Sequence, residues 1–221
     1  MKSYIILPLT FKSELPNRFK DDDNRFPEGL VEIFLEEYTK PGDKVIDIFA
    51  GFGTTLVVAE QMDRVGYGVE LNEDRCNYAR SQLKNKDNLI CGDTRLIDEY
   101  DLPEMDFALC SPIYMNKSWN MNPLTADSSP GTYFGYLDEL QEIFSKMKRI
   151  VKTGGHVVLE VANIKRDLVT TFAWDVCRAL SRELLFEREI IICWESPKSD
   201  NDVYAYGYDH SYCLIFRNSF Q

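Results

Sequence analysis

The sequence predicts an α/β fold, with helices on both faces of a mostly parallel sheet. Short apolar runs of strand composition alternate along the chain with stretches of helical periodicity. The first run, residues 44–48, leads into a glycine turn and then a helix, which is the βα unit of a parallel sheet. The last two runs follow each other without a helix between them. They predict an antiparallel edge strand at the C-terminal end of the chain.

The individual elements follow from apolar spacing and from the residues at their ends. Apolar side chains at helical spacing predict a helix over residues 27–38, with Pro27 in its first turn, and Asn72 is typical of a cap for a later helix. The other predicted helices cover residues 54–62, 72–83, 136–150 and 168–184. The predicted strands cover residues 44–48, 65–70, 89–91, 107–110, 156–161, 187–194 and 212–216. Two polar stretches, residues 115–132 and 196–209, are predicted loops of a length that is often functional.

Length and composition predict one folded domain over residues 1–221, because no Pro-, Ser- or Gly-rich linker divides the chain. A net charge of -11 argues against tight non-specific binding to nucleic acid, since lysine and arginine supply most of that affinity. A set of basic residues forms either a local patch or an ordinary solvated helix face. Its members are Lys117, Lys146, Lys148, Arg149, Lys152, Lys165 and Arg166.

The six cysteines form no C-x-x-C pair, and the two histidines complete no zinc-ligand spacing. Scattered cysteines in apolar stretches predict buried thiols in a reducing compartment. The apolar run at residues 4–9 is short, contains a proline and lacks a small-residue cleavage site, so it does not read as a leader. No run is long enough to span a bilayer. A cytoplasmic location is therefore predicted.

Glycines and acids follow the first three predicted strands, whose carboxyl ends meet at one edge of a parallel sheet. Asp47 ends the first strand, Gly51 and Gly53 form the turn, Glu70 ends the second strand, and Asp93 follows the third. The third glycine of the dinucleotide fingerprint is absent, so a cofactor without phosphate fits better. S-adenosyl-L-methionine meets that description. Its ribose is expected on Glu70, its adenine amino group near Asp93, and its ammonium beside Asp47, where a pyrophosphate would be repelled.

Several segments carry a resemblance to one family. Residues 47–55, Asp-Ile-Phe-Ala-Gly-Phe-Gly-Thr-Thr, resemble the cofactor motif D-P-F-A-G-S-G-T-T, and residues 111–114, Ser-Pro-Ile-Tyr, resemble the catalytic motif S/D/N-P-P-Y. Residues 27–30 and 210–216 resemble the segment before the cofactor motif and the last strand. The chain thus resembles the amino-group DNA methyltransferases, which methylate N4 of cytosine or N6 of adenine. The resemblance covers residues 26–216 and implies a Rossmann-like methyltransferase fold.

The resemblance also assigns site residues. An exocyclic amine is a poor nucleophile because its lone pair is delocalised, so acceptors for its hydrogens are needed. The Ser111 hydroxyl and the Pro112 carbonyl are suitable acceptors, and the Tyr114 ring offers a face to a flipped base. Serine at the first position resembles the N4-cytosine members, while Ile113 replaces the second proline. The predicted cofactor-binding residues are Asp47, Phe49, Ala50, Gly51, Gly53, Thr54, Thr55, Glu70, Leu71, Asp93, Thr94 and Cys110.

The sequence is also compatible with other substrates and with a non-catalytic function. The same chemistry serves for guanine N2 in RNA or for a protein glutamine, and a non-catalytic cofactor-binding subunit would keep the same motifs. Residues 111–114 alone would also suit an ordinary strand-exit turn with a packed tyrosine. The expected partner is DNA, reached through a flipped base, with no metal and no membrane. Since the loops leave little room for a recognition segment, either the sequence specificity is modest, or a second copy of the chain or a partner supplies it.

Overall fold

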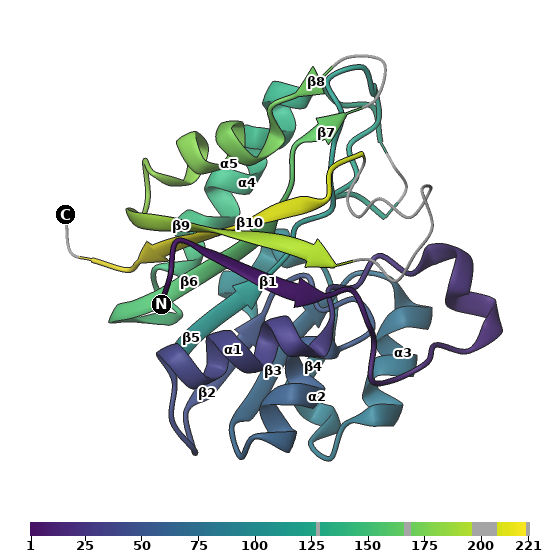
Figure 1. Cartoon of the computed structure of the whole chain (residues 1–221), viewed down its shortest axis with the longest axis vertical. Helices are drawn as coiled ribbons and strands as arrows, with labels where there is room; N and C mark the ends of the chain where they lie inside the picture. Colours follow the sequence, from purple (N-terminus) through teal and green to yellow (C-terminus); the bar gives the residue numbers. More distant parts are fainter. Residues whose placement is uncertain (127–128, 166–168, 196–206, 220–221) are drawn as a thin grey trace.

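The computed structural model describes residues 1–126, 129–165, 169–195 and 207–219. Over these residues the chain forms an eight-stranded sheet in the order β1-β9-β10-β6-β5-β2-β3-β4 (Figure 1). Its strands are β1 (Tyr4–Pro8), β2 (Lys44–Asp47), β3 (Val65–Glu70), β4 (Leu89–Cys91), β5 (Met105–Cys110), β6 (Val151–Val161), β9 (Leu185–Glu195) and β10 (His210–Arg217). Neighbours pair in parallel except where β10 meets β6 and β9. The predicted fold class is confirmed.

Helices cover both faces of this sheet (Figure 1). They are α1 (Glu28–Tyr38), α2 (Thr54–Gln61), α3 (Glu73–Gln82), α4 (Tyr133–Met147) and α5 (Phe172–Leu180). The predicted cap is present, because the Asn72 side chain accepts a hydrogen bond from the Arg75 amide at 3.0 Å. Shorter elements are the 3-10 turns η1 (Asn17–Asp22), η2 (Lys86–Asn88) and η3 (Thr94–Glu99) and the hairpin of β7 (Ile164–Lys165) and β8 (Val169–Thr170).

The central strand β5 shows why the sheet needs helices on both sides. Its side chains alternate between the two faces, as the pleat of a strand requires. Phe107 and Leu109 pack in the cluster under α1, whereas Ala108 and Cys110 pack in the cluster under α4 and α5. All four are fully buried. Because both faces are covered, the strand reads as a continuous apolar run, and its polar residues come at its carboxyl end.

The structure places two strands differently from the prediction. The antiparallel strand β10 lies inside the sheet, because β9 pairs with its outer side and β1 then pairs in parallel with β9. No strand is predicted for residues 4–8 from the sequence, although Ile5 and Leu7 pack against the cluster under α1 while Tyr4 and Ile6 face outward. Five residues with one proline are too short a run for alternation to stand out.

The observed element boundaries differ from the predicted ones by a few residues. The helix predicted over 136–150 begins at Tyr133, because the Thr132 hydroxyl accepts a hydrogen bond from the Gly135 amide at 3.1 Å. The helix predicted over 168–184 is the shorter α5, preceded by the β7–β8 hairpin. Most of the predicted loop 196–209 lies outside the described residues, as does Arg166 of the basic set. None of the helices in the described ranges combines the length and the apolar character needed to cross a bilayer.

A disulfide bond joins Cys76 on α3 to Cys91 at the end of β4, with 5.7 Å between their Cα atoms. The expectation that the cysteines are free thiols is therefore wrong for this pair. The two residues lie on the consecutive elements α3 and β4, and no spacing motif indicates that their side chains face each other. Cys110, Cys177, Cys193 and Cys213 are free.

We expect Cys91→Ser to lower the free energy of unfolding of the oxidised protein. The disulfide closes a loop with a sequence separation of 15. Constraining a loop of that size in the unfolded chain contributes about 3 kcal/mol. Urea unfolding of the wild type with and without dithiothreitol, beside the variant, measures the loss. Cys193→Ser removes a free thiol and is the control; equal midpoints for all samples would contradict a stabilising bond.

Candidate active site

The carboxyl ends of β2, β3, β5 and β6 surround a cavity of about 420 Å³. Most of the predicted site residues line it. They are Asp47, Phe49, Ala50, Gly51, Thr54, Glu70, Leu71, Asp93, Thr94, Ser111, Pro112 and Tyr114. The structure therefore brings together side chains that are more than sixty positions apart in the sequence, because parallel strands end at the same edge of a sheet.

Gly53, Thr55 and Cys110 do not line the cavity. Gly53 has a φ of 85°, and a Cβ there would come within 2.9 Å of the Ala79 Cβ, so glycine lets the turn pack against α3. Thr55 is fully buried and holds Asp47 from behind. Cys110 points into the core under α4 and α5, where burial raises the pKa of its thiol well above the ordinary value. These three residues lie behind the cavity wall.

Asp47 places a buried carboxylate at the cavity wall. It is 2 % exposed. One carboxylate oxygen accepts the Phe49 amide at 3.0 Å, and the other accepts the Thr55 hydroxyl at 2.7 Å. Burial raises the pKa of Asp47 to about 7, although these two hydrogen bonds act in the opposite direction. A cation placed next to such a buried carboxylate strongly stabilises its ionised form.

Glu70 joins the glycine turn to the start of α3. Its carboxylate accepts the Gly51 amide at 2.7 Å and the Asn72 amide at 2.8 Å. Gly51 has a φ of 54°, a conformation that favours glycine. Burial raises the pKa of the Glu70 carboxyl above its ordinary value, while the two backbone hydrogen bonds lower it. Glu70 lines the cavity, and each of its carboxylate oxygens can accept a further hydrogen bond from a hydroxyl group.

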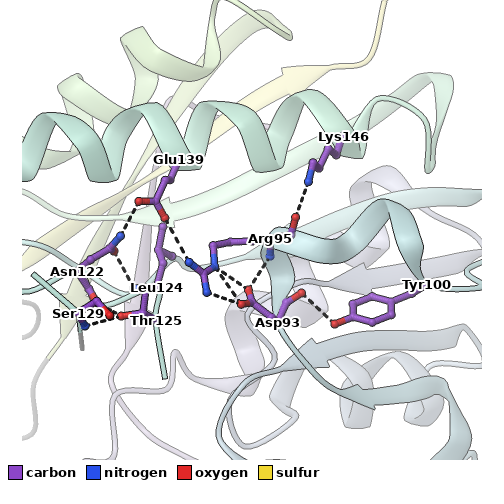
Figure 2. A network of polar contacts seen from close by, with 9 residues as sticks. All are labelled: Asp93, Arg95, Tyr100, Asn122, Leu124, Thr125, Ser129, Glu139 and Lys146. Atoms are coloured by element: carbon purple, nitrogen blue, oxygen red, sulfur yellow. Dashed lines mark hydrogen bonds and ion pairs between the residues drawn. The ribbon is translucent and has the colours of Figure 1, made fainter. Parts of the chain in front are cut away.

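Asp93 is held by Arg95 (Figure 2). Its carboxylate accepts the Arg95 amide at 2.9 Å and the Arg95 guanidinium at distances from 2.6 Å to 3.1 Å. Burial alone would raise the pKa of Asp93, but the hydrogen bonds and the charge of Arg95 hold it below the ordinary value. The carboxylate is therefore an ionised acceptor in a fixed orientation at the cavity wall.

Ser111 faces a carboxylate that the sequence analysis missed. The Ser111 hydroxyl donates to Glu160 Oε2 at 3.2 Å, and both side chains line the cavity. Glu160 lies on β6 and is 1 % exposed. It is the charged residue in the otherwise apolar run Val157–Val161, and that irregularity is the signal that sequence reasoning could have used. A hydroxyl that donates to a carboxylate turns its lone pairs toward the remaining space.

The turn around Ile113 is held by two tyrosines. The Tyr136 hydroxyl donates to the Ile113 carbonyl at 2.6 Å. The Tyr114 hydroxyl accepts the Ala162 amide at 2.6 Å, and its ring contacts Phe172 with 4.6 Å between centroids. The phenol hydroxyl of Tyr114 thus binds the protein backbone, and Tyr114 is also one of the residues that line the cavity.

The segment before α1 forms a further wall that the sequence analysis did not predict. Leu9, Phe11 and residues 23–26 line the cavity. Glu28 anchors this segment, because its carboxylate accepts the Lys12 amide at 3.0 Å and the Ser13 hydroxyl at 2.7 Å. Burial acts against ionisation of Glu28, but these hydrogen bonds lower its pKa below the ordinary value. The cavity is thereby closed on a side that the strand ends leave open.

Comparison with known proteins finds a family match in the first third of the chain. A family model described as DNA methylase, for the N6 and N4 methyltransferases, matches residues 9–81. This part of the chain is similar to the amino-group DNA methyltransferases. Residues 9–81, the methylase segment, include the glycine turn, Asp47 and Glu70, and they end before residues 111–114. The likeness of the later motifs to the family rests on residues 111–114 and 210–216 themselves.

Two relatives show how far the methylase similarity reaches. The type II methyltransferase M.SmaI of Serratia marcescens is 38% identical over 58 residues, which are 26% of this chain and 20% of that protein. The type II methyltransferase M.Cfr9I of Citrobacter freundii is 42% identical over 62 residues, which are 28% of this chain and 21% of that protein. The matched stretch thus spans about a fifth of the length of each relative.

The fold extends beyond the methylase segment. The crystal structure of TrmN from Thermus thermophilus superposes on this chain with a TM-score of 0.62. The aligned region covers 93% of this chain and 54% of TrmN. At 18% sequence identity this similarity shows a shared fold and nothing about substrate. It confirms that the sheet and helices form a Rossmann-like methyltransferase fold.

Proposed function

We propose that this chain binds S-adenosyl-L-methionine and transfers its methyl group to an exocyclic amino group of a DNA base, with N4 of cytosine favoured over N6 of adenine. The observation that carries the proposal is the hydrogen-bonded pair of Ser111 and Glu160 in the same cavity as Asp47, Glu70 and Asp93. The pair supplies an acceptor for an amine hydrogen, and the three acids supply partners for a cationic nucleoside.

The acids of the cavity fit this cofactor. Asp47 would hold the ammonium, because its buried carboxylate has a pKa of about 7 and, within the described residues, its hydrogen bonds come from the Phe49 amide and the Thr55 hydroxyl and not from a cation. Glu70 would accept the ribose hydroxyls, and Asp93 would accept the adenine amino group. A cofactor with a pyrophosphate would meet these three carboxylates and be repelled. When bound, S-adenosyl-L-methionine supplies a methyl group on a positively charged sulfur.

The chain's own residues prepare the amine. The Ser111 hydroxyl donates to Glu160, so its lone pairs are free to accept one amine hydrogen, and the Pro112 carbonyl accepts the other. Holding both amine hydrogens on one side of the nitrogen favours a pyramidal nitrogen whose lone pair points to the methyl carbon. As the new N–C bond forms, the bond from that carbon to the cofactor sulfur would break with its electron pair left on sulfur, and the nitrogen would lose a proton. Ser111 takes this proton and passes its own to Glu160, so no free hydronium ion is needed.

The acceptor base would lie on the Tyr114 ring, which is fixed by Phe172 and by the Ala162 amide. A base must leave its stack to reach a buried cavity, and an aromatic face compensates part of the lost stacking. Serine at position 111 supports the preference for cytosine N4. The net charge of -11 gives the chain little affinity for a phosphate backbone, so a second copy or a partner would contribute recognition.

We place the enzyme in the cytoplasm, where it has access to DNA.

The experiment that tests the proposal is a methyl-transfer assay with the purified chain, tritiated S-adenosyl-L-methionine and separate pools of DNA and RNA, followed by mass spectrometry of the nucleosides. The expected product is N4-methylcytosine in DNA. N6-methyladenine would contradict the base preference, and label in RNA or in the protein alone would contradict DNA as substrate. Cofactor binding without transfer to any polymer would contradict an enzymatic role.

We expect Glu160→Gln to lower kcat about 10- to 100-fold while leaving the Kd of the cofactor within about twofold, because a glutamine cannot take the proton from Ser111. The amide can still accept the Ser111 hydrogen bond, so the geometry of the pair persists. Single-turnover kinetics and isothermal titration measure the two quantities. Glu189→Gln, an exposed position on β9, is the control. An unchanged kcat in Glu160→Gln would remove Glu160 from the proton path.

A further inference from the structure

A chain of polar contacts connects Asp93 to the long segment before α4 (Figure 2). Arg95 lies between two acids: it binds Asp93 through several hydrogen bonds, and its Nη1 lies 4.0 Å from Glu139 Oε2. Glu139 projects from α4, and its other oxygen accepts the Asn122 side-chain amide at 2.7 Å. Four residues from three segments of the chain thus form one charged network.

Asn122 organises the turn that carries Leu124. Its side-chain oxygen accepts the Leu124 amide at 3.0 Å, and its backbone carbonyl accepts the Thr125 hydroxyl at 2.9 Å. Asn122 and Leu124 are 5 % and 4 % exposed. Leu124 lines the same cavity as Asp93 and Arg95. The polar network therefore fixes both an acid and an apolar side chain on one part of the cavity wall.

The backbone at the other end of the network is also fixed. The Tyr100 hydroxyl donates to the Asp93 carbonyl at 3.0 Å, and Lys146 Nζ donates to the Arg95 carbonyl at 2.5 Å. Lys146 comes from α4, as Glu139 does. Among the described residues, Glu139 Oε2 is the buried side-chain oxygen without a hydrogen bond, so its charge depends on Arg95 for compensation. Removing charge at Glu139 therefore changes the balance that holds the guanidinium between its two acids.

From this network we infer that Arg95 and Glu139 are positioning residues for the adenine end of the cofactor, acting through Asp93 on its amino group and through Asn122 on the Leu124 wall. The inference rests on the proposed function, because it assumes that Asp93 faces adenine. It adds that recognition of the adenine amino group and placement of the residue 121–126 turn are energetically coupled. The coupling path is the contiguous set of contacts from Asp93 to Leu124.

The test compares two ligands in a binding experiment that requires no methyl transfer. The ligands are S-adenosylhomocysteine and the same compound with hydrogen in place of the adenine amino group. By isothermal titration we expect the wild type to prefer the amino compound about tenfold, the order expected for a hydrogen bond to a charged acceptor. In Glu139→Gln the preference should fall to about twofold, and Arg95→Lys should show the same loss, because a lysine cannot bridge two acids with a planar fork.

Glu142→Gln is the matched control, since Glu142 is on the same helix, pairs with Lys146 at 3.7 Å and has a side chain 70% exposed. It should keep the tenfold preference. Hydrogen exchange provides the second measurement: S-adenosylhomocysteine should protect residues 121–126 in the wild type and not in Glu139→Gln. An unchanged ligand preference together with unchanged protection in Glu139→Gln would overturn the inference.

Failure of the two proposals can be told apart. A wild-type protein that binds neither ligand contradicts the cofactor assignment and this inference together. Binding with the expected loss of preference in Glu139→Gln, but without methyl transfer to any polymer, contradicts only the proposed activity. Thermal melting of each variant in the absence of ligand shows whether the fold is intact before binding is compared.

Discussion

Ser111→Ala is expected to lower kcat about 100- to 1,000-fold, the range for loss of one well-placed polar group in an active site. Alanine removes the acceptor for one amine hydrogen, and it also leaves Glu160 without the hydroxyl that donates to it at 3.2 Å. Cofactor affinity should stay within about twofold, because the acids assigned to the cofactor lie on β2, β3 and after β4. Single-turnover assays with tritiated cofactor measure kcat, and isothermal titration measures the Kd.

Ser118→Ala is the control for this experiment. Ser118 also carries a hydroxyl in the segment after β5, donates to Asn116 and does not line the cavity. It should leave both constants unchanged. A Ser111→Ala variant with wild-type turnover would remove the hydroxyl from the reaction. A variant that loses cofactor binding to the same degree as turnover would assign Ser111 to binding and not to the amine.

The parts of the site that could be predicted are those fixed by local sequence. Asp47 and Glu70 each end an apolar run, and a residue at the end of a parallel strand must lie at the ligand-binding edge of the sheet. Gly51 and Gly53 follow Asp47 directly, so their turn faces the same edge. The motif at Ser111 follows β5 for the same reason. In all of these cases the position along the chain already determines the position in space.

The residues that sequence reasoning missed depend on contacts between distant segments. Glu160 faces the cavity because β6 pairs in parallel with β5 in a register that places Leu159 opposite Cys110. That register is not encoded near either residue. The wall formed by Phe11 and residues 23–26 has no periodicity; Lys12 and Ser13 donate hydrogen bonds to Glu28, and Arg25 donates to Ser13. Cys76 and Cys91 meet because α3 packs on β4, which no cysteine spacing expresses.

The position of β10 within the sheet also depends on contacts between distant segments and could not be predicted from local sequence. Two consecutive strands without a helix predict an antiparallel pair, and β9 and β10 are one. The prediction could not tell which of the two neighbours β6. That choice is made by burial: Leu214 and Phe216 fill one side of β10 and Cys213 and Ile215 the other, so this strand needs cover on both faces. The outer strand β9 has partly exposed residues and accepts β1.

Asp47→Asn is expected to weaken cofactor binding at least about 100-fold while leaving the free protein no less stable at pH 8. Asparagine has the same shape, so its oxygen can accept the Phe49 amide and its amide group can donate to Thr55, the two partners of Asp47. The negative charge that would pair with the ammonium is lost. Isothermal titration with S-adenosylhomocysteine and urea unfolding measure the two effects. A variant that binds as tightly as the wild type would place the ammonium elsewhere.

The pH dependence gives the same prediction an independent check. Burial raises the pKa of Asp47 to about 7, above the unfolded value near 3.8, so the free folded protein binds a proton that the unfolded chain releases. As the pH rises from about 4 through 7, the wild type therefore loses folding stability at this site, and Asp47→Asn does not. Cofactor binding has the opposite sign, because a cation selects the ionised carboxylate. Below the pKa the binding-competent fraction falls, so the Kd of the wild type should rise about tenfold between pH 8 and pH 6. A Kd that is flat over this range in the wild type would show that Asp47 does not meet the charged end of the cofactor.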